Sequence, residues 1–510
     1  VSVTLGDFDE AYTPLTLWNR DNLDLKYMPE MIAREDDTLK YESFLNHEPE
    51  WPFRGARAGT ALMWPDSQLL DRFSVSAMTD FVSNGFNDTS GQVFYFGGFS
   101  NFIFGANADL KSRRWYLGGP SLQLAMDAYA VILAQPLGTN APGSIYVQFN
   151  PDTWAHHYRI TSLKPSLDFG LGDDASFGGT WEGAEAVYQD DERDNNKVIS
   201  DYAILAGPYF RFGRSKISFN YLHVGPYYYS PLAQTRQDDL VPGSGADNAV
   251  TPDIFTPPLR SQFFLSAVPR AGDIFSFYDR TQDNTFPYGL STPNREGGGL
   301  DLDVKTLEKD ALKIKGSVYF VQEISDNLVV NAAGTGVTTI DGNPAAPTPQ
   351  RSFAYVNLGP SIDLGPLLQM STDLVVGVNA RYERTDSSLG TLTSTWILGG
   401  AQVGILPWWE FAVSYGDQEI SGQEAGYGGS TLARYAYLFD NTDLGQYQVF
   451  NINGGNQSFR LSSVFKISRN STLALDWAQT GGNAVPYVGA TPTGNSVNNQ
   501  YAEMTYEIQF

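Results

Sequence analysis

The chain has 510 residues, a formal net charge of −24 and no cysteine. The acidic charge argues against nucleic-acid binding, and the lack of cysteine excludes disulfides, thiolate metal sites and iron–sulfur clusters. Aromatic residues make up 14% of the chain and glycine contributes 50 residues, yet no run of 18 apolar residues occurs. The sequence therefore predicts no membrane helix, and its composition suits a β-barrel whose strands show one face to lipid.

Apolar and polar residues alternate with a period of two along most of the chain, which predicts strands with one apolar face. The expected strands, in chain order, are 1–9, 54–64, 71–83, 94–109, 119–134, 158–171, 176–188, 199–212, 214–224, 299–308, 312–331, 351–363, 371–384, 392–405, 409–420, 456–467, 470–480 and 500–510. They total about 18, within a range of roughly 16–20 that boundary errors allow. An even number places both ends of the chain on one side of a barrel.

Short and long connections are expected to alternate between these strands. The short turns are 172–175, 213–214, 308–311, 406–408 and 468–470; the long loops are 10–53, 84–93, 135–157, 189–198, 225–298, 332–350, 421–455 and 481–499. Short periplasmic turns opposite long outer loops are typical of membrane barrels. We therefore expect an all-β chain that forms a single transmembrane antiparallel β-barrel domain over residues 1–510. A soluble all-β protein is the alternative, although no blade-length repeat supports a propeller.

The polar rows of these strands would line a water-filled lumen. On 371–384, for example, Val376, Val378 and Tyr382 take the lipid face and leave Arg381 and Glu383 inside. The predicted lumen-lining charges are Asp80, Asp127, Asp373, Arg381, Glu383, Arg460, Lys466, Asp476, Glu503 and Glu507. On the lipid face an arginine or lysine would cost about 2–4 kcal/mol at the midplane, and an aspartate or glutamate somewhat less. The alternative for each residue is a cross-strand ion pair that braces the wall without a transport role.

Two long loops could narrow the lumen. The segment 225–298 is rich in proline and carries arginines and aspartates that, if folded inward, would set a transverse field and a size limit. The candidate constriction residues are Arg260, Arg270, Arg280, Asp253, Asp273 and Asp279. An extracellular flap is the alternative for this loop. The loop 10–53 is a second candidate for inward folding.

An acidic cluster on a predicted outer loop is a weak calcium candidate. Asp190, Asp191, Glu192 and Asp194 alternate oxygen ligands but match no EF-hand spacing, so a solvated turn is the alternative. No catalytic motif stands in a fitting context. We therefore expect no enzyme activity, and no cofactor apart from calcium at this loop.

The last ten residues form a strand that ends on an aromatic residue. Ala502, Met504, Tyr506, Ile508 and Phe510 share its apolar face. With Tyr506, Ile508 and Phe510 as the signal, this end resembles the assembly signal of bacterial outer-membrane β-barrels. Together with the repeated amphipathic hairpins, it makes the chain resemble the porin-like barrels of Gram-negative cell envelopes. The resemblance is one of class and implies insertion by the barrel assembly machinery, contact with outer-membrane lipid and lipopolysaccharide, and passive transport. The start at Val1 predicts a processed precursor.

Three functions follow from this interpretation. The first is a porin-like channel for small hydrophilic solutes or ions, with a mild cation preference from the acidic loops. The second is a structural barrel with an occluded lumen that binds a partner protein or a surface polymer through its outer loops. The third is an exopolymer export channel, which would need a lumen dominated by arginine and lysine. Homo-oligomerisation and an envelope protein partner both stay open.

Overall fold

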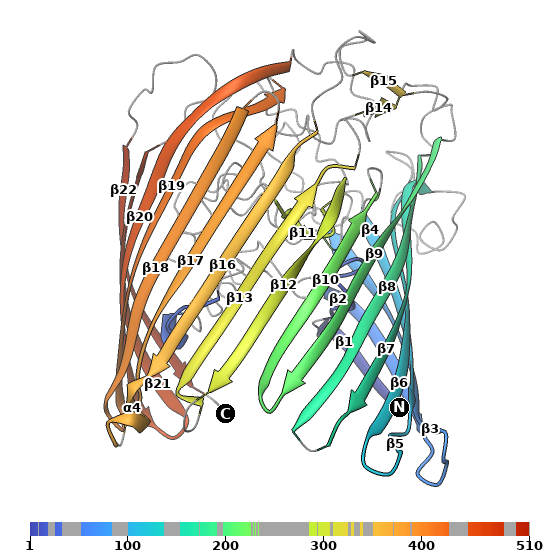
Figure 1. Cartoon of the computed structure of the whole chain (residues 1–510), viewed down its shortest axis with the longest axis horizontal. Coiled ribbons are helices and arrows are strands. Elements are labelled where there is room, and N and C mark those ends of the chain that lie inside the picture. Colours follow the sequence, from blue (N-terminus) through green and yellow to red (C-terminus); the bar gives the residue numbers. More distant parts are fainter. Residues whose placement is uncertain are drawn as a thin grey trace.

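Eighteen strands form one antiparallel sheet that curves around a central space in the computed structural model (Figure 1). The strands are β1 Ser2–Phe8, β2 Phe53–Met63, β3 Leu70–Ser83, β4 Ser100–Ser112, β6 Ser121–Pro136, β7 Trp154–Gly170, β8 Ala175–Asp190, β9 Lys197–Phe212, β10 Ser215–Val224, β12 Arg295–Thr306, β13 Leu312–Gln322, β16 Ser352–Asp363, β17 Leu374–Ser387, β18 Gly390–Leu406, β19 Trp409–Tyr427, β20 Tyr447–Ser468, β21 Ser471–Asn483 and β22 Ser496–Ile508. Each pairs with the next in this order, and the two-residue strand β5 Trp115–Tyr116 adds to β6.

The structure describes the strands, their short turns and parts of the long connections. The described residues are 1–8, 10–18, 26–32, 53–83, 100–136, 154–172, 174–190, 197–225, 228, 230, 233, 285–292, 294–306, 310–324, 328–330, 337–339, 350–370, 372–387, 390–427, 447–483 and 496–508. Within them, no helix has the length and apolar character that crossing a membrane would require.

The two faces of the sheet differ as the alternation predicts. Large apolar side chains on the outer face are exposed, among them Leu124, Met126 and Val378, whereas inner-face neighbours such as Asn379 and Arg381 are buried. An exposed apolar outer face with a polar inner face is the arrangement of a bilayer-spanning barrel. Met504 and Tyr506 on β22 are likewise exposed, which confirms the orientation predicted for the final strand.

The short turns and both sheet ends follow the predicted sidedness. The start of β1 and the end of β22 lie at the same end of the sheet (Figure 1). The short turns lie there too, including the one-turn helix α4 Leu364–Leu367, which Asp363 caps. Trp408 stacks on Trp409 and Phe465 at this end, as expected of an interfacial aromatic belt. The ends of β17 and β18 are an exception, because Ser387 pairs with Gly390 at the end of the sheet away from α4.

The structure corrects several predicted boundaries. β19 runs to Tyr427 and β20 starts at Tyr447, so both strands extend into the loop predicted over 421–455. The strand predicted over 312–331 ends at Gln322, because Leu328–Val330 (β14) pairs with Val337–Thr339 (β15) in a separate hairpin. The strand predicted from 299 starts at Arg295, whose ladder with β10 reaches Val224. β17 starts at Leu374, so Asp373 lies in the bend that follows α4 and is exposed.

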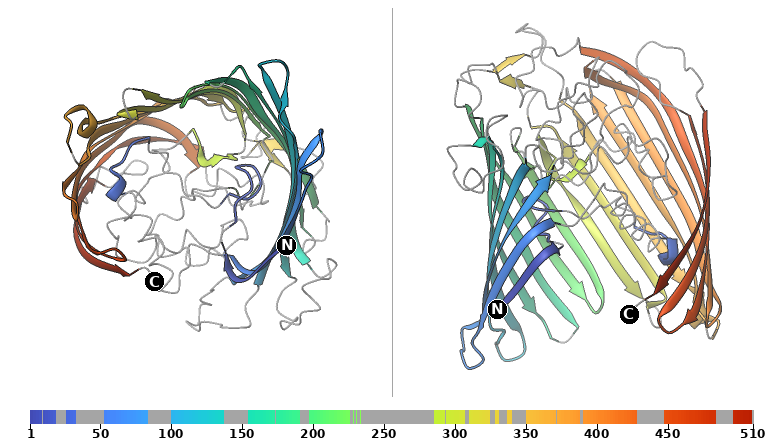
Figure 2. Two further views of the ribbon diagram at one scale, coloured as in Figure 1. Left: turned by 90° about the horizontal axis from the view of Figure 1, so that it is seen from below. Right: turned by 180° about the vertical axis from the view of Figure 1, so that it is seen from behind.

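Parts of the long connections lie inside the curved sheet. Figure 2 shows the short blue segments that follow β1 within the enclosed space, one of them beside the orange and red strands. Short strand β11 Pro287–Leu290 also belongs to an inner segment. In the described residues, β1 and β22 form no ladder with each other, and Figure 2 shows them as facing edges.

Candidate functional site

The predicted lumen-lining charges fall into different surroundings. Asp80, Arg381, Glu383, Arg460 and Asp476 are buried on the inner face. Asp127 lines a cavity, and Lys466 is half exposed beside Glu410 near a turn. Asp373 lies outside the strands. Glu503 and Glu507 belong to β22, but their side chains lie outside the description.

Arg381 and Glu383 form a buried pair rather than a hydrated lumen surface. Arg381 Nε donates to Glu383 Oε1 at 2.8 Å. The backbone N–H and hydroxyl of Thr285 donate to Glu383 Oε2 at 3.3 and 3.2 Å. The arginine also lies over the ring of Tyr355. The inner segment 285–292 therefore covers this pair, and the water-filled surroundings predicted for it are wrong because protein groups replace the water.

A second buried charge cluster, which sequence reasoning missed, lies just beyond the ends of β13 and β16. Glu323 accepts hydrogen bonds from the Nε and backbone N–H of Arg351, each at 3.0 Å, and lies 3.4 Å from Arg295 Nη1. Both arginines lie over the ring of Phe353. Burial alone would raise the pKa of the Glu323 carboxyl, but the charges of Arg351 and Arg295 and the hydrogen bonds from Arg351 hold it below its usual value. No sequence pattern signals this cluster, because its members are far apart in the chain.

The segment 10–18 packs inside the sheet against β8 and against residues that follow β10. Thr13 donates its hydroxyl hydrogen to Glu182 Oε1 at 2.5 Å. The Tyr228 hydroxyl donates to the Leu15 carbonyl at 2.7 Å, and both side chains are fully buried. Burial raises the pKa of the Tyr228 phenol well above its usual value. Both long loops therefore contribute interior segments, whereas a constriction of the lumen by 10–53 or 225–298 stays a prediction.

The segment 26–32 is seated in a groove lined by glycines on the inner face of β16, β17 and β18. A Cβ at Gly377 would lie 2.6 Å from the ring of Tyr27, and one at Gly400 would lie 2.6 Å from Pro29. The Tyr27 hydroxyl donates to the Gly400 carbonyl at 3.0 Å. Because the strands carry no side chains at these positions, a chain segment can approach the wall closely.

Wall amides hold the backbone of this segment. The Lys26 N–H donates to Asn379 Oδ1 at 2.7 Å, and the Met31 N–H donates to Gln402 Oε1 at 3.1 Å. Met31 and Ile32 are buried against Ala412 of β19. The seat therefore satisfies backbone donors and buries two apolar side chains, as a stably held segment requires. Burial raises the pKa of the Tyr27 phenol to about 12.

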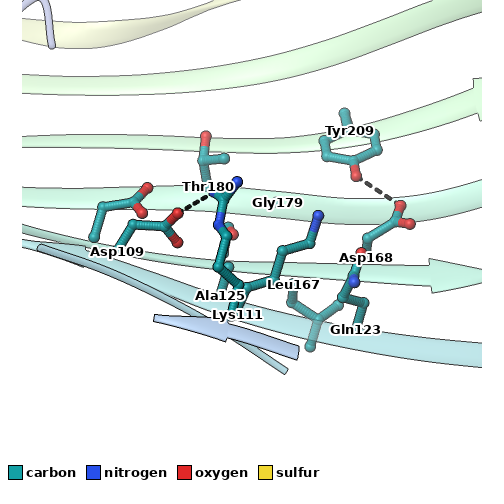
Figure 3. Close-up of a pocket in the computed structure, with 12 residues that line it drawn as sticks. Asp109, Lys111, Gln123, Ala125, Leu167, Asp168, Gly179, Thr180 and Tyr209 are labelled. Atoms are coloured by element: carbon teal, nitrogen blue, oxygen red, sulfur yellow. Dashed lines mark hydrogen bonds and ion pairs between the residues drawn. The ribbon is translucent and has the colours of Figure 1, made fainter. Parts of the chain in front are cut away.

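A charged cavity of about 380 Å³ opens on the inner wall on the other side of the sheet (Figure 3). Its lining comes entirely from strands β3, β4, β6, β7, β8 and β9 and includes Arg72, Asp109, Lys111, Asp127 and Asp168. These residues lie toward the end of the barrel that carries the short turns, because they are close to the ends of their strands at that side.

Polar contacts organise the rim of this cavity. Arg72 pairs with Asp109. Asp168 accepts from the Tyr209 hydroxyl at 2.7 Å and pairs with Arg114 of the adjoining turn at 2.5 Å. Figure 3 shows Asp109 and Asp168 at opposite sides of the cavity with Lys111 between them. Of the predicted residues only Asp127 belongs here; the alternation could have indicated Asp109 and Asp168, which occupy inward positions of predicted strands.

Other predicted sites lie largely outside the described residues. All six candidate constriction residues do so: Arg260, Arg270, Arg280, Asp253, Asp273 and Asp279. Of the calcium candidates, Asp190 ends β8, whereas Asp191, Glu192 and Asp194 lie outside the description. In the part of the chain that is described, no group of three acidic or histidine side chains is placed to hold a metal ion. Ile508 ends β22, and Phe510 lies outside the description.

Comparisons with known proteins yield structural matches only. No protein-family model matches the chain, and no curated protein sequence matches it. Among the solved structures, the copper transporter OprC matches with a TM-score of 0.43 and 9% identity, over 89% of this chain and 64% of that chain. The chain therefore spans less than two thirds of the length of OprC.

Two further matches are more distant. OmpT, an outer membrane protein of Vibrio cholerae, has a TM-score of 0.26 and 8% identity, over 76% of this chain and 99% of that one. BauA, the ferric preacinetobactin receptor from Acinetobacter baumannii, has a TM-score of 0.29 and 7% identity, over 88% and 70%. All three are outer-membrane β-barrel proteins. The strand ladders and the exposed apolar outer face themselves make this chain a β-barrel of the bacterial outer-membrane type, as its sequence predicts.

Proposed function

We propose that the protein is an outer-membrane channel for the passive diffusion of small hydrophilic solutes or ions, with a mild cation preference. The observation that carries the proposal is the charged cavity on the inner wall of β3–β9. All of its lining residues belong to wall strands, so no inner segment among the described residues covers it. A hydrated strip of wall is what a polar solute needs to cross the apolar layer.

The charged side chains of the inner wall favour the passage of polar solutes. Asp109, Asp127 and Asp168 line the cavity together with Arg72 and Lys111. Fixed charges of both signs lower the barrier for solutes that exchange water for polar contacts. The net charge of −24 adds a long-range attraction for cations.

Conductance in planar bilayers tests this function directly. The purified chain, folded in detergent and added to one side, is expected to produce stepwise currents, and a salt gradient is expected to give a reversal potential on the cation side. The double variant Asp109→Asn with Asp127→Asn should move that potential toward the anion side. A folded protein that produces no current would contradict the proposal.

An occluded barrel that binds a partner through its outer loops is the second candidate. The observation that favours it is the complete burial of Leu15, Tyr228 and Ile32 inside the sheet. An absence of current together with capture of an envelope protein or a surface polymer would support this candidate. Export of an anionic exopolymer is disfavoured, since the cavity is lined by three aspartates and only two cationic residues, whereas an acidic polymer needs a lining dominated by arginine and lysine.

The remaining expectations are part of the same proposal. We assign the protein no catalytic activity and no cofactor. Its partners would be outer-membrane lipid and lipopolysaccharide, the barrel assembly machinery and, in the membrane, further copies of the chain or an envelope protein. Calcium at Asp190 and its neighbours would be a surface ion rather than part of the transport path.

A further inference from the structure

The floor of the charged cavity is a row of small side chains across three strands. Ala125 of β6 pairs with Ser166 of β7, which in turn pairs with Thr180 of β8. Small residues at three adjacent inward positions leave a recess in the wall, whereas longer side chains would fill it. The volume of about 380 Å³ falls within the usual range of small-molecule sites.

A pair of carboxylates borders this floor on one side. Asp109 of β4 and Asp127 of β6 are direct partners in the ladder. Side chains that face each other in this way have Cβ atoms about 4.5–5.5 Å apart, and two like charges there destabilise the pair. Arg72 neutralises Asp109 from β3, and Lys164 is the ladder partner of Asp127 on β7. Both cations approach from the neighbouring strands, and a positive group placed between the two carboxylates would relieve the repulsion between them.

A cation borders the floor at its end. Lys111 is two residues from Asp109 on the same face of β4, and its ladder partners are Ala125 on β6 and Arg72 on β3, neither of which has a side-chain acceptor for it. Among the described residues, the side-chain ammonium of Lys111 makes no hydrogen bond or ion pair. The separation of two residues along a strand is about 6.6 Å. A carboxylate binding at Lys111 would therefore lie one short molecule away from an ammonium at the aspartate pair.

The opposite border of the cavity, at Asp168, also brings together charges of both signs. Asp168 is the ladder partner of Gln123 and pairs with Arg114. A lone cation in the cavity would meet Lys111 and Arg72, and a lone anion would meet three aspartates. An uncharged polyol would form no ion pair, so the charged side chains of the cavity would interact with water only. A solute with one positive and one negative group can pair with an aspartate and with a cationic side chain of the cavity at the same time.

We propose that this cavity is a subsite for small zwitterions of amino-acid to dipeptide size, with the ammonium at Asp109–Asp127 and the carboxylate at Lys111. This assignment rests on the proposed channel function and names the substrate class of the same wall. Such a subsite would select solutes by their pattern of charges, whereas a general porin lumen selects them by size.

Vesicle swelling distinguishes the assignment from the channel function. Vesicles containing the protein are placed in glycylglycine or in arabinose, an uncharged solute of similar size. Glycylglycine is expected to enter about threefold faster, the scale of a partly exposed ion-pair contribution. Lys111→Gln and Asp127→Asn should each bring the ratio close to one. Lys315→Gln is the matched control, because Lys315 is an exposed inward residue of β13 outside the cavity.

The outcomes separate clearly. Equal entry of both solutes into vesicles with the unaltered protein would overturn the zwitterion subsite and leave the channel standing. An equal loss of selectivity in Lys315→Gln would also overturn it, because the effect would then not be local. If neither solute enters, the channel function fails, and calorimetric titration of the detergent-folded protein with glycylglycine decides the subsite. Binding that Lys111→Gln weakens would support it, and absence of binding would overturn it.

Discussion

The inner wall of the barrel has two regions that use charge in opposite ways. On β12–β18, inner segments cover the wall, and charges such as Arg381, Glu383 and Glu323 are buried in contacts with protein groups. On β3–β9, toward the short turns, Asp109, Asp127 and Asp168 line a cavity. The same alternation in sequence produces both regions. The comparison shows that the alternation in sequence places a charged residue on the inner face. Whether that residue forms a buried ion pair or can contact a solute depends on whether an inner segment of the chain lies over it.

Replacing Glu323 should have the largest effect on stability. Glu323→Gln would leave Arg295 and Arg351 buried without a counter-charge, and breaking a buried pair costs about 3–5 kcal/mol. Urea unfolding of the protein in phospholipid vesicles measures this change. Asp168→Asn is the control from the other region. Equal losses in both variants would contradict the distinction between the two regions.

Filling the glycine groove should have the next largest effect. In Gly377→Val the new side chain meets the ring of Tyr27, so the segment 26–32 is pushed from its seat, at a cost of about 1–3 kcal/mol. We expect a larger single-channel conductance, because the displaced segment no longer occupies the wall. Gly399→Val is the matched control, since a Cβ there meets no atom within 4 Å. An unchanged conductance in Gly377→Val would show that this segment does not limit the pathway.

Acidification should weaken the region on β12–β18 that inner segments cover. The folded-state pKa of Glu323 is lowered, so its contribution to stability is full above the ordinary glutamate pKa and is lost as the pH falls through the lower folded value. The difference in unfolding free energy between the unaltered chain and Glu323→Gln should therefore shrink on acidification below about pH 4.3. A difference that stays constant from pH 6 to below pH 3 would refute this linkage.

Neutralising one charge of the cavity on β3–β9 should have the smallest effect on stability. Asp168→Asn keeps the bond from Tyr209 and weakens only a partly exposed pair with Arg114, so the loss should be below about 1 kcal/mol. Its reversal potential, however, should shift toward the anion side because the cavity loses a negative charge. A large stability loss without a shift in potential would place Asp168 among the bracing residues.

Particular strands show why so much of the fold could be predicted. A strand that crosses a bilayer must alternate, and its lipid face cannot carry charge, so Met126, Val378 and Tyr506 mark the outer face from the sequence alone. The inward positions of Asp127, Arg381 and Arg460 then follow by parity. The groove could not be predicted, because glycines 377 and 400 become a seat only when a segment more than 300 residues away lies against them.

The sequence by itself determined the number of strands, which face of each strand meets lipid and at which end most of the short turns lie. These properties are local, because the alternation of apolar and polar residues along a strand and the composition of a turn can both be recognised within ten to twenty residues. The tertiary structure alone decided which inward charges are buried and which line a cavity. That choice depends on segments 10–18, 26–32 and 285–292, whose packing against distant strands is set by shape and hydrogen bonding rather than by periodicity.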